Sequence, residues 1–155
     1  MNLSSTAFAD GGSIPAHYTC DGDRLMNPPL AFSGVPPRAA SLALIMEDPD
    51  VPKALRSEPF DHWVLFNIPP GTTGIPEGGT AGIAGVNSRN EMDYTGPCPP
   101  PQYKPATHRY IFTLYALDKM LDLAAGSSKA ELLAAMQGRI VARAQLVGRY
   151  RRMGV

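Results

Sequence analysis

The chain has 155 residues, its formal net charge is zero, and hydrophobic and charged residues make up 44% and 18% of it. This composition suits a compact fold and excludes a disordered chain, and the length predicts one domain spanning residues 1–155. Because the 14 basic and 14 acidic side chains balance, the overall charge gives no reason to expect binding to nucleic acid.

The sequence carries no sign of export or of a membrane anchor. The first 12 residues lack the basic and apolar regions of a secretory signal, and no apolar run approaches the roughly 20 residues of a spanning helix. We therefore expect a cytoplasmic protein without a transmembrane segment. Its two cysteines, Cys20 and Cys98, are too few for a disulfide scaffold, and whether they pair stays open.

Proline and glycine are frequent along the whole chain. With 16 prolines and 15 glycines, the sequence favours short strands joined by irregular loops over a helical bundle. Residues 41–46 form an apolar run that ends at turn-forming residues, which predicts a buried strand. Residues 61–68 are rich in aromatic and β-branched side chains and predict a second strand.

The clearest strand is predicted over residues 108–117. Side chains alternate between the two faces of a strand, so His108 and Tyr110 should share one face. In the same way, we expect His62 to share a face with Val64 and Phe66. If these faces meet at one end of the sheets, two imidazoles and a phenol converge there.

One helix is predicted near the C-terminus. Ser128 and Glu131 have the spacing of a capping box, and a stripe of apolar residues follows at helical spacing up to Met136. Gly138 is placed to end this helix. Beyond it the period changes to two, which predicts a strand over residues 139–147.

The candidate binding residues border these strands. His62 and His108 lie at the beginnings of predicted strands, next to loops, where sites are often built on a rigid scaffold. Asp48 lies between a strand and Pro49, and its carboxylate could orient an imidazole by accepting the ring N–H. The competing interpretation of Asp48 is a simple Asx turn that caps the strand.

A proline-rich segment at residues 94–101 supplies the wall of the predicted pocket. Most residues of its 96–101 part are prolines and lack a backbone N–H, so the segment must be a rigid loop and not a central strand. Pro99 and Pro100 then form a firm wall, although the segment could equally be a plain connector. We expect Cys98 to be a small packed thiol beside the pocket.

Two catalytic interpretations have less support in the sequence than the binding pocket described above. His62, His108 and Asp48 match the ligand types of a metal-binding triad, but the spacing of the usual metal motifs is missing. The sequence also lacks the Gly-x-Ser-x-Gly motif of serine hydrolases, and the glycines at residues 78–82 lack the lysine of a phosphate-binding loop. We therefore expect no cofactor and no bound metal.

Several motifs, taken together, resemble the phosphatidylethanolamine-binding protein family, and in particular its bacterial, Raf-kinase-inhibitor-like branch. They occur in the family's order along almost the whole chain. The matching segments are YTCDG (18–22), NPPL (27–30), EDPDVP (47–52), DHWV (61–64), GPCPP (96–100), HRY (108–110), LYALD (114–118) and LVGRYR (146–151).

The resemblance implies a mainly β fold of two antiparallel sheets, a Greek-key-like sandwich with one or two short helices. It also implies a small pocket for phosphate or phosphorylethanolamine-like groups, in which both histidines and the tyrosine hydroxyl donate hydrogen bonds. Nothing in the chain looks like an activated nucleophile, so we expect binding without turnover. The family's pocket residues fall here on Asp48, His62, Cys98, Pro99, Pro100, His108 and Tyr110.

The resemblance leaves two further functions open. Some family members regulate a kinase or a protease, and a protein target of this kind is the main alternative to headgroup binding. The His/His/Asp set leaves a metal-dependent hydrolase as the second. Bacterial relatives also suggest a homodimer. Residues 101–107 form a longer loop than the family pattern has, which could cover the pocket mouth.

Overall fold

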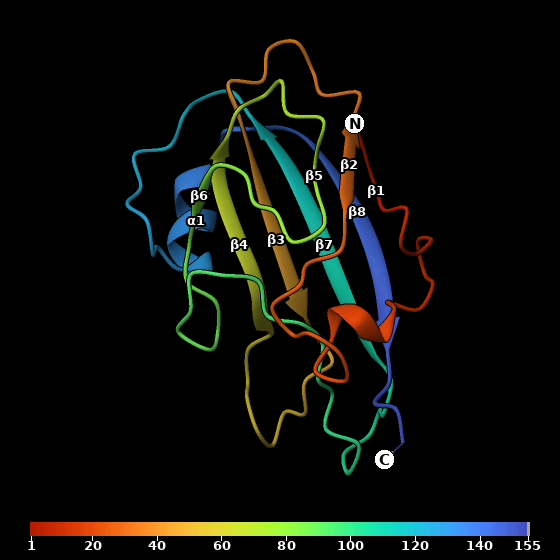
Figure 1. Ribbon diagram of the computed structural model, residues 1–155. Helices are drawn as coiled ribbons and strands as arrows, with labels where there is room; N and C mark the ends of the chain where they lie inside the picture. The colour runs from red at the N-terminus through yellow and green to blue at the C-terminus, as the bar shows by residue number, and fades with distance from the viewer. Residues whose placement is uncertain (155) are drawn as a thin grey trace.

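The computed structural model describes residues 1–154, in which short strands alternate with long loops (Figure 1). Within these residues, a 3-10 turn (Ala16–Tyr18) lies between the first and second strands. The strands and the helix, in chain order, are β1 (Asn2–Ser4), β2 (Leu30–Ser33), β3 (Ser41–Asp48), β4 (Phe60–Ile68), β5 (Gly74–Ile75), β6 (Ile83–Ala84), β7 (His108–Leu117), α1 (Lys129–Met136) and β8 (Ile140–Tyr150).

The strands form two antiparallel sheets, which confirms the predicted mainly β fold. The larger sheet has the order β6-β4-β3-β7-β8, and the smaller one has the order β1-β2-β5. Every pair of neighbouring strands in both sheets is antiparallel. Figure 1 shows α1 beside β4, on the side of the larger sheet that the smaller sheet does not cover.

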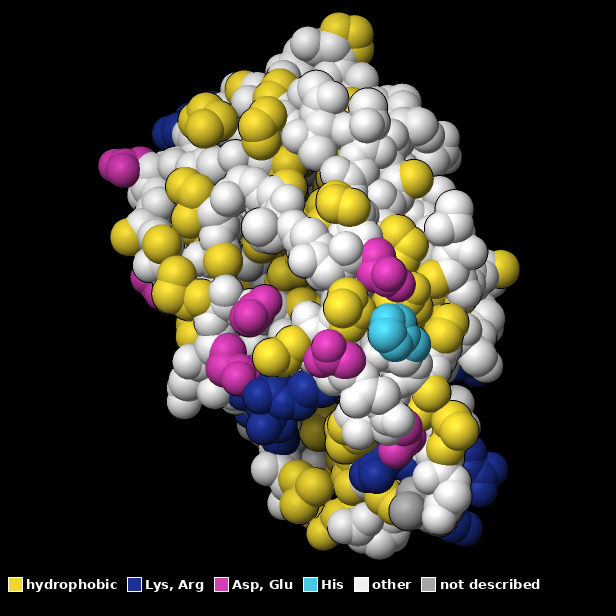
Figure 2. All heavy atoms as spheres, in the orientation of Figure 1, with side chains coloured by type: hydrophobic (Ala, Val, Ile, Leu, Met, Phe, Trp, Pro, Cys, Tyr) yellow, Lys and Arg dark blue, Asp and Glu magenta, His cyan; other side chains and the backbone are white. Residues whose placement is uncertain are grey.

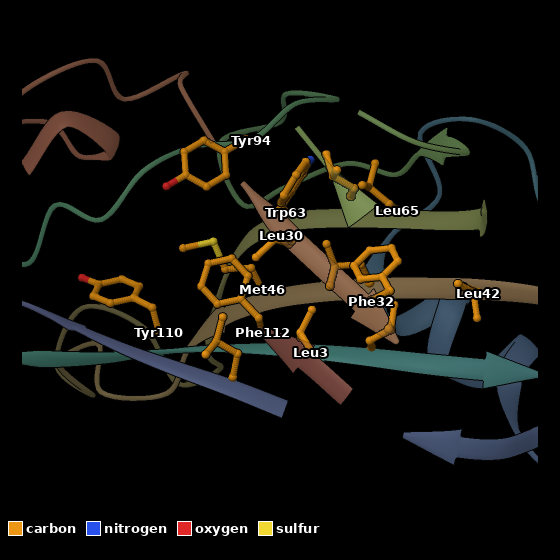
Figure 3. Close-up of a cluster of buried hydrophobic side chains, with 14 of the residues drawn as sticks. Leu3, Leu30, Phe32, Leu42, Met46, Trp63, Leu65, Tyr94, Tyr110 and Phe112 are labelled. Carbon is orange, nitrogen blue, oxygen red and sulfur yellow. The ribbon is translucent and has the colours of Figure 1, made fainter. Parts of the chain in front are cut away.

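The main core lies between the two sheets. Leu3, Leu30 and Phe32 from the small sheet pack against inward side chains of β3, β4 and β7, such as Met46 and Phe112 (Figure 3). A second cluster fills the space between the large sheet and α1. Because both faces of β3 are covered, its sequence is continuously apolar and does not alternate.

The longer predicted elements are confirmed, and several are extended. β7 has the predicted bounds, β3 continues to Asp48, and β8 continues to Tyr150, because pairing with the neighbouring strands goes on after the apolar pattern ends. Sequence analysis missed β1, β2, β5 and β6. Each has only two to four residues, too few to show a period.

The helix α1 begins as the sequence predicts. Ser128 Oγ accepts a hydrogen bond from the Glu131 N–H at 3.1 Å, and Glu131 Oε1 accepts one from the Ser128 N–H at 3.0 Å. Gly138 follows the helix with φ of 76°, a conformation that glycine adopts without strain. Within residues 1–154, no helix is long and apolar enough to cross a membrane.

Candidate functional site

The predicted site residues converge at one end of the large sheet. Asp48 is the last residue of β3, His108 is the first of β7, and His62 is the third of β4. Because β3 runs antiparallel to both neighbours, its end lies beside their beginnings, at the lower end of the sheet in Figure 1. All seven predicted residues line one cavity of about 300 Å³, a size suited to a small ligand.

His62 owes its place to a β-bulge. In the register between β3 and β4, Met46 pairs with Trp63, whereas the next residue, Glu47, pairs with Asp61. His62 is therefore an extra residue without a partner opposite it on β3. Such bulges bend a strand and redirect a side chain, and they often occur next to functional sites.

The bulge makes the predicted face of His62 wrong. Regular alternation would group its ring with Val64 and Phe66, which belong to the cluster packed against α1. Instead the His62 ring meets the edge of the Tyr110 ring, with centroids 5.2 Å apart. Phe60 packs against the same imidazole at 4.8 Å. The two histidines thus reach one cavity because the register shifts by one residue.

Asp48 fills both of the roles that its sequence context suggests. Its Oδ1 accepts a hydrogen bond from the Asp50 N–H at 2.7 Å, which is the Asx turn. Its Oδ2 accepts the Nδ1–H of His108, also at 2.7 Å. The carboxylate therefore fixes the loop and the imidazole at once. His108 Nε2 is buried and has no hydrogen-bond partner among residues 1–154.

His62 is oriented by the main chain and not by an acid. Its Nδ1 lies 2.7 Å from the carbonyl oxygen of Thr95, and because a carbonyl can only accept, Nδ1 carries the proton. Burial lowers the pKa of His62 from 6.5 to about 4, although Thr95 and Asp48 oppose the shift. The ring is thus neutral at pH 7, and its Nε2 is an acceptor, contrary to the expected donor role.

Tyr110 completes the inner wall of the cavity. Its ring stacks on that of His108, with centroids 6.4 Å apart and an angle of 23° between the planes. Figure 3 shows its hydroxyl pointing away from the cluster around Phe112. Burial, and then the charge of Asp48, raises the pKa of Tyr110 above its ordinary value, so the group stays a phenol that can donate a hydrogen bond.

The second acid of the Asp-Pro-Asp motif has a positioning role. Arg109 binds both oxygens of Asp50, with Nε at 2.9 Å and Nη2 at 2.8 Å, and its backbone N–H adds a third hydrogen bond. The guanidinium holds the pKa of Asp50 below its usual range. This pair fastens the loop after β3 to the start of β7, which keeps Asp48 and His108 together.

Sequence analysis missed two arginines that line the cavity, Arg56 and Arg89. The Arg56 guanidinium lies over the Phe60 ring, 5.4 Å from its centroid. Arg89 Nε lies 3.6 Å from Glu91, whose carboxylate also forms two hydrogen bonds with Arg24. Most Lys and Arg side chains visible in Figure 2 lie in its lower half, the end where the cavity loops lie in Figure 1. Single arginines in loops form no sequence pattern, so nothing in the sequence singled them out.

Cys20 and Cys98 form a disulfide, so the expected packed thiol at Cys98 is wrong. Their Cα atoms lie 5.4 Å apart, and the Cys20 N–H donates to the Pro97 carbonyl oxygen at 3.1 Å. The bond ties the N-terminal segment to the proline-rich cavity wall. Disulfides persist mainly in oxidising compartments, which weighs against the expected cytoplasmic location.

The loop at residues 101–107 lies outside the cavity wall. Most of its residues are exposed, and none of residues 101–107 is among those that line this cavity. The longer loop therefore does not cover the mouth. Asn90, in the preceding loop, takes φ of 61° and so keeps the backbone shape that glycine would give.

The arrangement of the acids and histidines does not resemble a metal site. Both carboxylate oxygens of Asp48 are already hydrogen-bonded, one to the Nδ1–H of His108 and the other to the Asp50 N–H, so Asp48 is not free to act as a third ligand beside the two histidines. In the part of the chain that the structure describes, no group of three or more His, Cys, Asp or Glu side chains is placed to hold a metal ion. The geometry instead leaves both Nε2 atoms for a ligand.

Gly96 is required where the cavity wall crosses the N-terminal segment, and we expect Gly96→Ala to destabilise the protein by about 1–3 kcal/mol. A Cβ there would lie 3.0 Å from Thr19 Cα and even closer to the Tyr18 carbonyl oxygen. Urea unfolding measures the loss. Gly71→Ala is the matched control, because open space surrounds that position. Equal stability of the two variants would contradict the assignment.

Comparisons with known proteins agree with this architecture. The family model described as phosphatidylethanolamine-binding protein matches residues 4–151. A relative from Methanothermobacter thermautotrophicus, named UPF0098 protein, is 48% identical over 98% of this chain and 99% of its own length. A second UPF0098 protein, from Chlamydia muridarum, is 44% identical over 97% of this chain and 98% of its own length.

Two crystal structures show the same fold. A phosphatidylethanolamine-binding protein homologue from Chlamydia trachomatis superposes with a TM-score of 0.91 at 43% identity, covering 97% of both chains. YbcL from Escherichia coli, described as a member of the mammalian family, gives a TM-score of 0.86 at 25% identity over 97% of this chain and 98% of its own. Sequence motifs, sheet topology and these matches agree, and the chain belongs to the phosphatidylethanolamine-binding protein family.

Proposed function

We propose that this protein binds a phosphate-type anion, free or as a phosphorylethanolamine-like headgroup, in the cavity between Asp48, His62, His108 and Tyr110. One observation carries the proposal: His108 Nε2 is buried in the cavity wall without a hydrogen-bond partner among residues 1–154. Leaving a buried polar atom unpaired costs about 1–3 kcal/mol, so an unpaired atom in a cavity is where a hydrogen bond with a ligand gains most.

The charges around the cavity support an anionic ligand. Arg56 and Arg89 place two guanidinium groups in its lining, and these groups bind phosphate oxygens well. Asp48 keeps its negative charge, but its oxygens are directed to the Nδ1–H of His108 and to the Asp50 N–H, which limits its repulsion of the anion. A ligand ammonium group, where one is present, would lie on the acidic side near Asp48.

Binding without turnover is the consistent expectation for this arrangement. The Tyr110 hydroxyl is held as a phenol, which makes it a poor nucleophile. The Thr95 hydroxyl accepts a hydrogen bond from Arg24 Nη1 at 3.1 Å, and within residues 1–154 it forms no hydrogen bond with an imidazole that could remove its proton. Each histidine has one nitrogen committed to a structural partner and one available for the ligand.

Calorimetric titration of the native protein with phosphate and with phosphorylethanolamine tests the proposal. We expect saturable binding that weakens about a hundredfold or more in His108→Ala, because the ligand loses its buried partner. His17→Ala is the matched control: His17 is exposed and lies outside the cavity lining. Stronger binding of phosphorylethanolamine than of phosphate would assign the headgroup.

His108→Ala also leaves Asp48 without its partner, so its folding must be checked. Circular dichroism and a thermal melt identify a variant that has unfolded. His108→Asn then replaces it, because an asparagine amide can still donate to the Asp48 carboxylate and places no polar group at the Nε2 position. An absence of binding in the native chain, or an affinity unchanged in both His108 variants, would contradict the proposed function.

A further inference from the structure

We propose that the cavity selects anions that carry an acidic O–H, such as a monoprotonated phosphate group, because His62 Nε2 accepts the hydrogen bond of that O–H. Anions of similar shape without a proton, such as sulfate, should be rejected. The inference rests on the proposed function and adds the protonation state of the ligand. It makes His62 the residue that determines specificity.

The main chain fixes the tautomer of His62. Its Nδ1–H donates to the Thr95 carbonyl oxygen at 2.7 Å, and the Thr95 N–H donates back to the His62 carbonyl oxygen at 3.0 Å. A flipped ring would turn a carbon towards this carbonyl and lose the first bond. The ring is therefore held with Nδ1 protonated, and Nε2 offers a lone pair to the cavity.

The two acids near His62 are already bound to other partners. Asp48 binds His108 and the Asp50 N–H, and Asp61 forms an ion pair with Lys129 at 2.8 Å. Neither carboxylate is hydrogen-bonded to the His62 ring. An imidazolium at His62 would thus be buried without direct contact with an anion, which is unfavourable.

The other groups near the His62 ring do not outweigh the effect of burial, which favours its neutral form. Phe60 contacts the ring and also lies under the Arg56 guanidinium. Burial, the largest influence, and the charge of His108 together lower the pKa of His62 to about 4. The titratable and charged groups that line the cavity around His62 are Asp48, His108, Tyr110, Arg56 and Arg89. Asp61 also acts on the pKa of His62 but lies outside this lining.

Sulfate and a monoprotonated phosphate group differ in the hydrogen bonds that they can form. Sulfate at neutral pH has only acceptor oxygens, so one of them would face the His62 lone pair. A monoprotonated phosphate group has one donor and several acceptors. It can satisfy His62 with its O–H while its other oxygens accept from Tyr110 and from the arginines.

The test compares methyl phosphate, dimethyl phosphate and sulfate by calorimetry at pH 6 and pH 8. A phosphate monoester loses its second proton at about pH 6, so its protonated form falls from about half to about 1% between these values. We expect its affinity to fall about 50-fold. At pH 6, sulfate and dimethyl phosphate, which have no proton to donate, should bind at least about tenfold more weakly.

Two further measurements isolate His62. In His62→Asn the amide can still donate to the Thr95 carbonyl oxygen but places no acceptor at the Nε2 position, so the preference for methyl phosphate over sulfate should fall towards one. Nitrogen-15 NMR of the native protein should show a neutral His62 with the proton on Nδ1. Sulfate affinity at the two pH values corrects for changes in the protein's own charges.

The outcomes separate this inference from the proposed function. Equal binding of methyl phosphate and sulfate, or a proton on His62 Nε2, would overturn the inference and leave anion binding standing. A native protein that binds none of the anions would overturn both. A methyl phosphate affinity that tracks its protonated form, together with the loss of preference in His62→Asn, would support the inference.

Discussion

Removal of the disulfide between Cys20 and Cys98 should lower the free energy of unfolding by about 4 kcal/mol. The bond joins cysteines separated by 78 residues, and a cross-link over so long a segment greatly restricts the unfolded chain. The double variant Cys20→Ser/Cys98→Ser, unfolded in urea beside the native protein, measures the loss. Few single interactions in a domain of this size contribute as much.

The same variant also tests the link between the disulfide and the cavity. Cys98 precedes the wall residues Pro99 and Pro100, and Asp21, next to Cys20, binds Arg152 at 3.1 Å. Without the cross-link we expect a weaker affinity for phosphate as well as a lower stability. Native protein in reductant should behave like the double variant, which should itself ignore reductant. A decrease in the free energy of unfolding below about 1 kcal/mol would show that other contacts hold the N-terminal segment against the cavity wall equally well.

Acidification from pH 6.5 to pH 4 should lower the free energy of unfolding by about 3 kcal/mol through His62. Burial lowers the pKa of His62 from 6.5 to about 4 in the folded protein, so the unfolded chain binds the proton more readily. The contribution of His62 to the free energy of unfolding is fully present above pH 6.5 and is lost progressively as the pH falls. Below about pH 4, His62 causes no further change. Urea unfolding at pH 7, 5.5 and 4.5 follows this change.

His62→Asn is the matched variant for the acid response. Asparagine does not titrate and can keep the hydrogen bond to Thr95, so the slope of stability against pH should flatten between pH 4 and 6.5. Acids stabilised by arginines, such as Asp50 with Arg109, have lowered pKa values and lose their contribution only at lower pH. An unchanged slope in the variant would show that the acid response arises elsewhere.

Residue patterns alone identified the long elements of this fold. β7 has the predicted bounds because its pairing with β3 and β8 continues along the segment that the residue pattern marked as a strand. The start of α1 follows from the capping pair Ser128 and Glu131, whose hydrogen bonds are local. Motif order identified the family, and with it seven of the residues that line the cavity, although their role in binding stays a prediction.

Tertiary structure decided what depends on contacts between distant segments. The face of His62 follows from a one-residue shift in register against β3, which no pattern within β4 reveals. Its acceptor role follows from a carbonyl oxygen 33 residues away in sequence. The disulfide and the two cavity arginines likewise depend on how loops meet in space. A local pattern predicts which residues form a strand, whereas pairing between strands decides which way a side chain points.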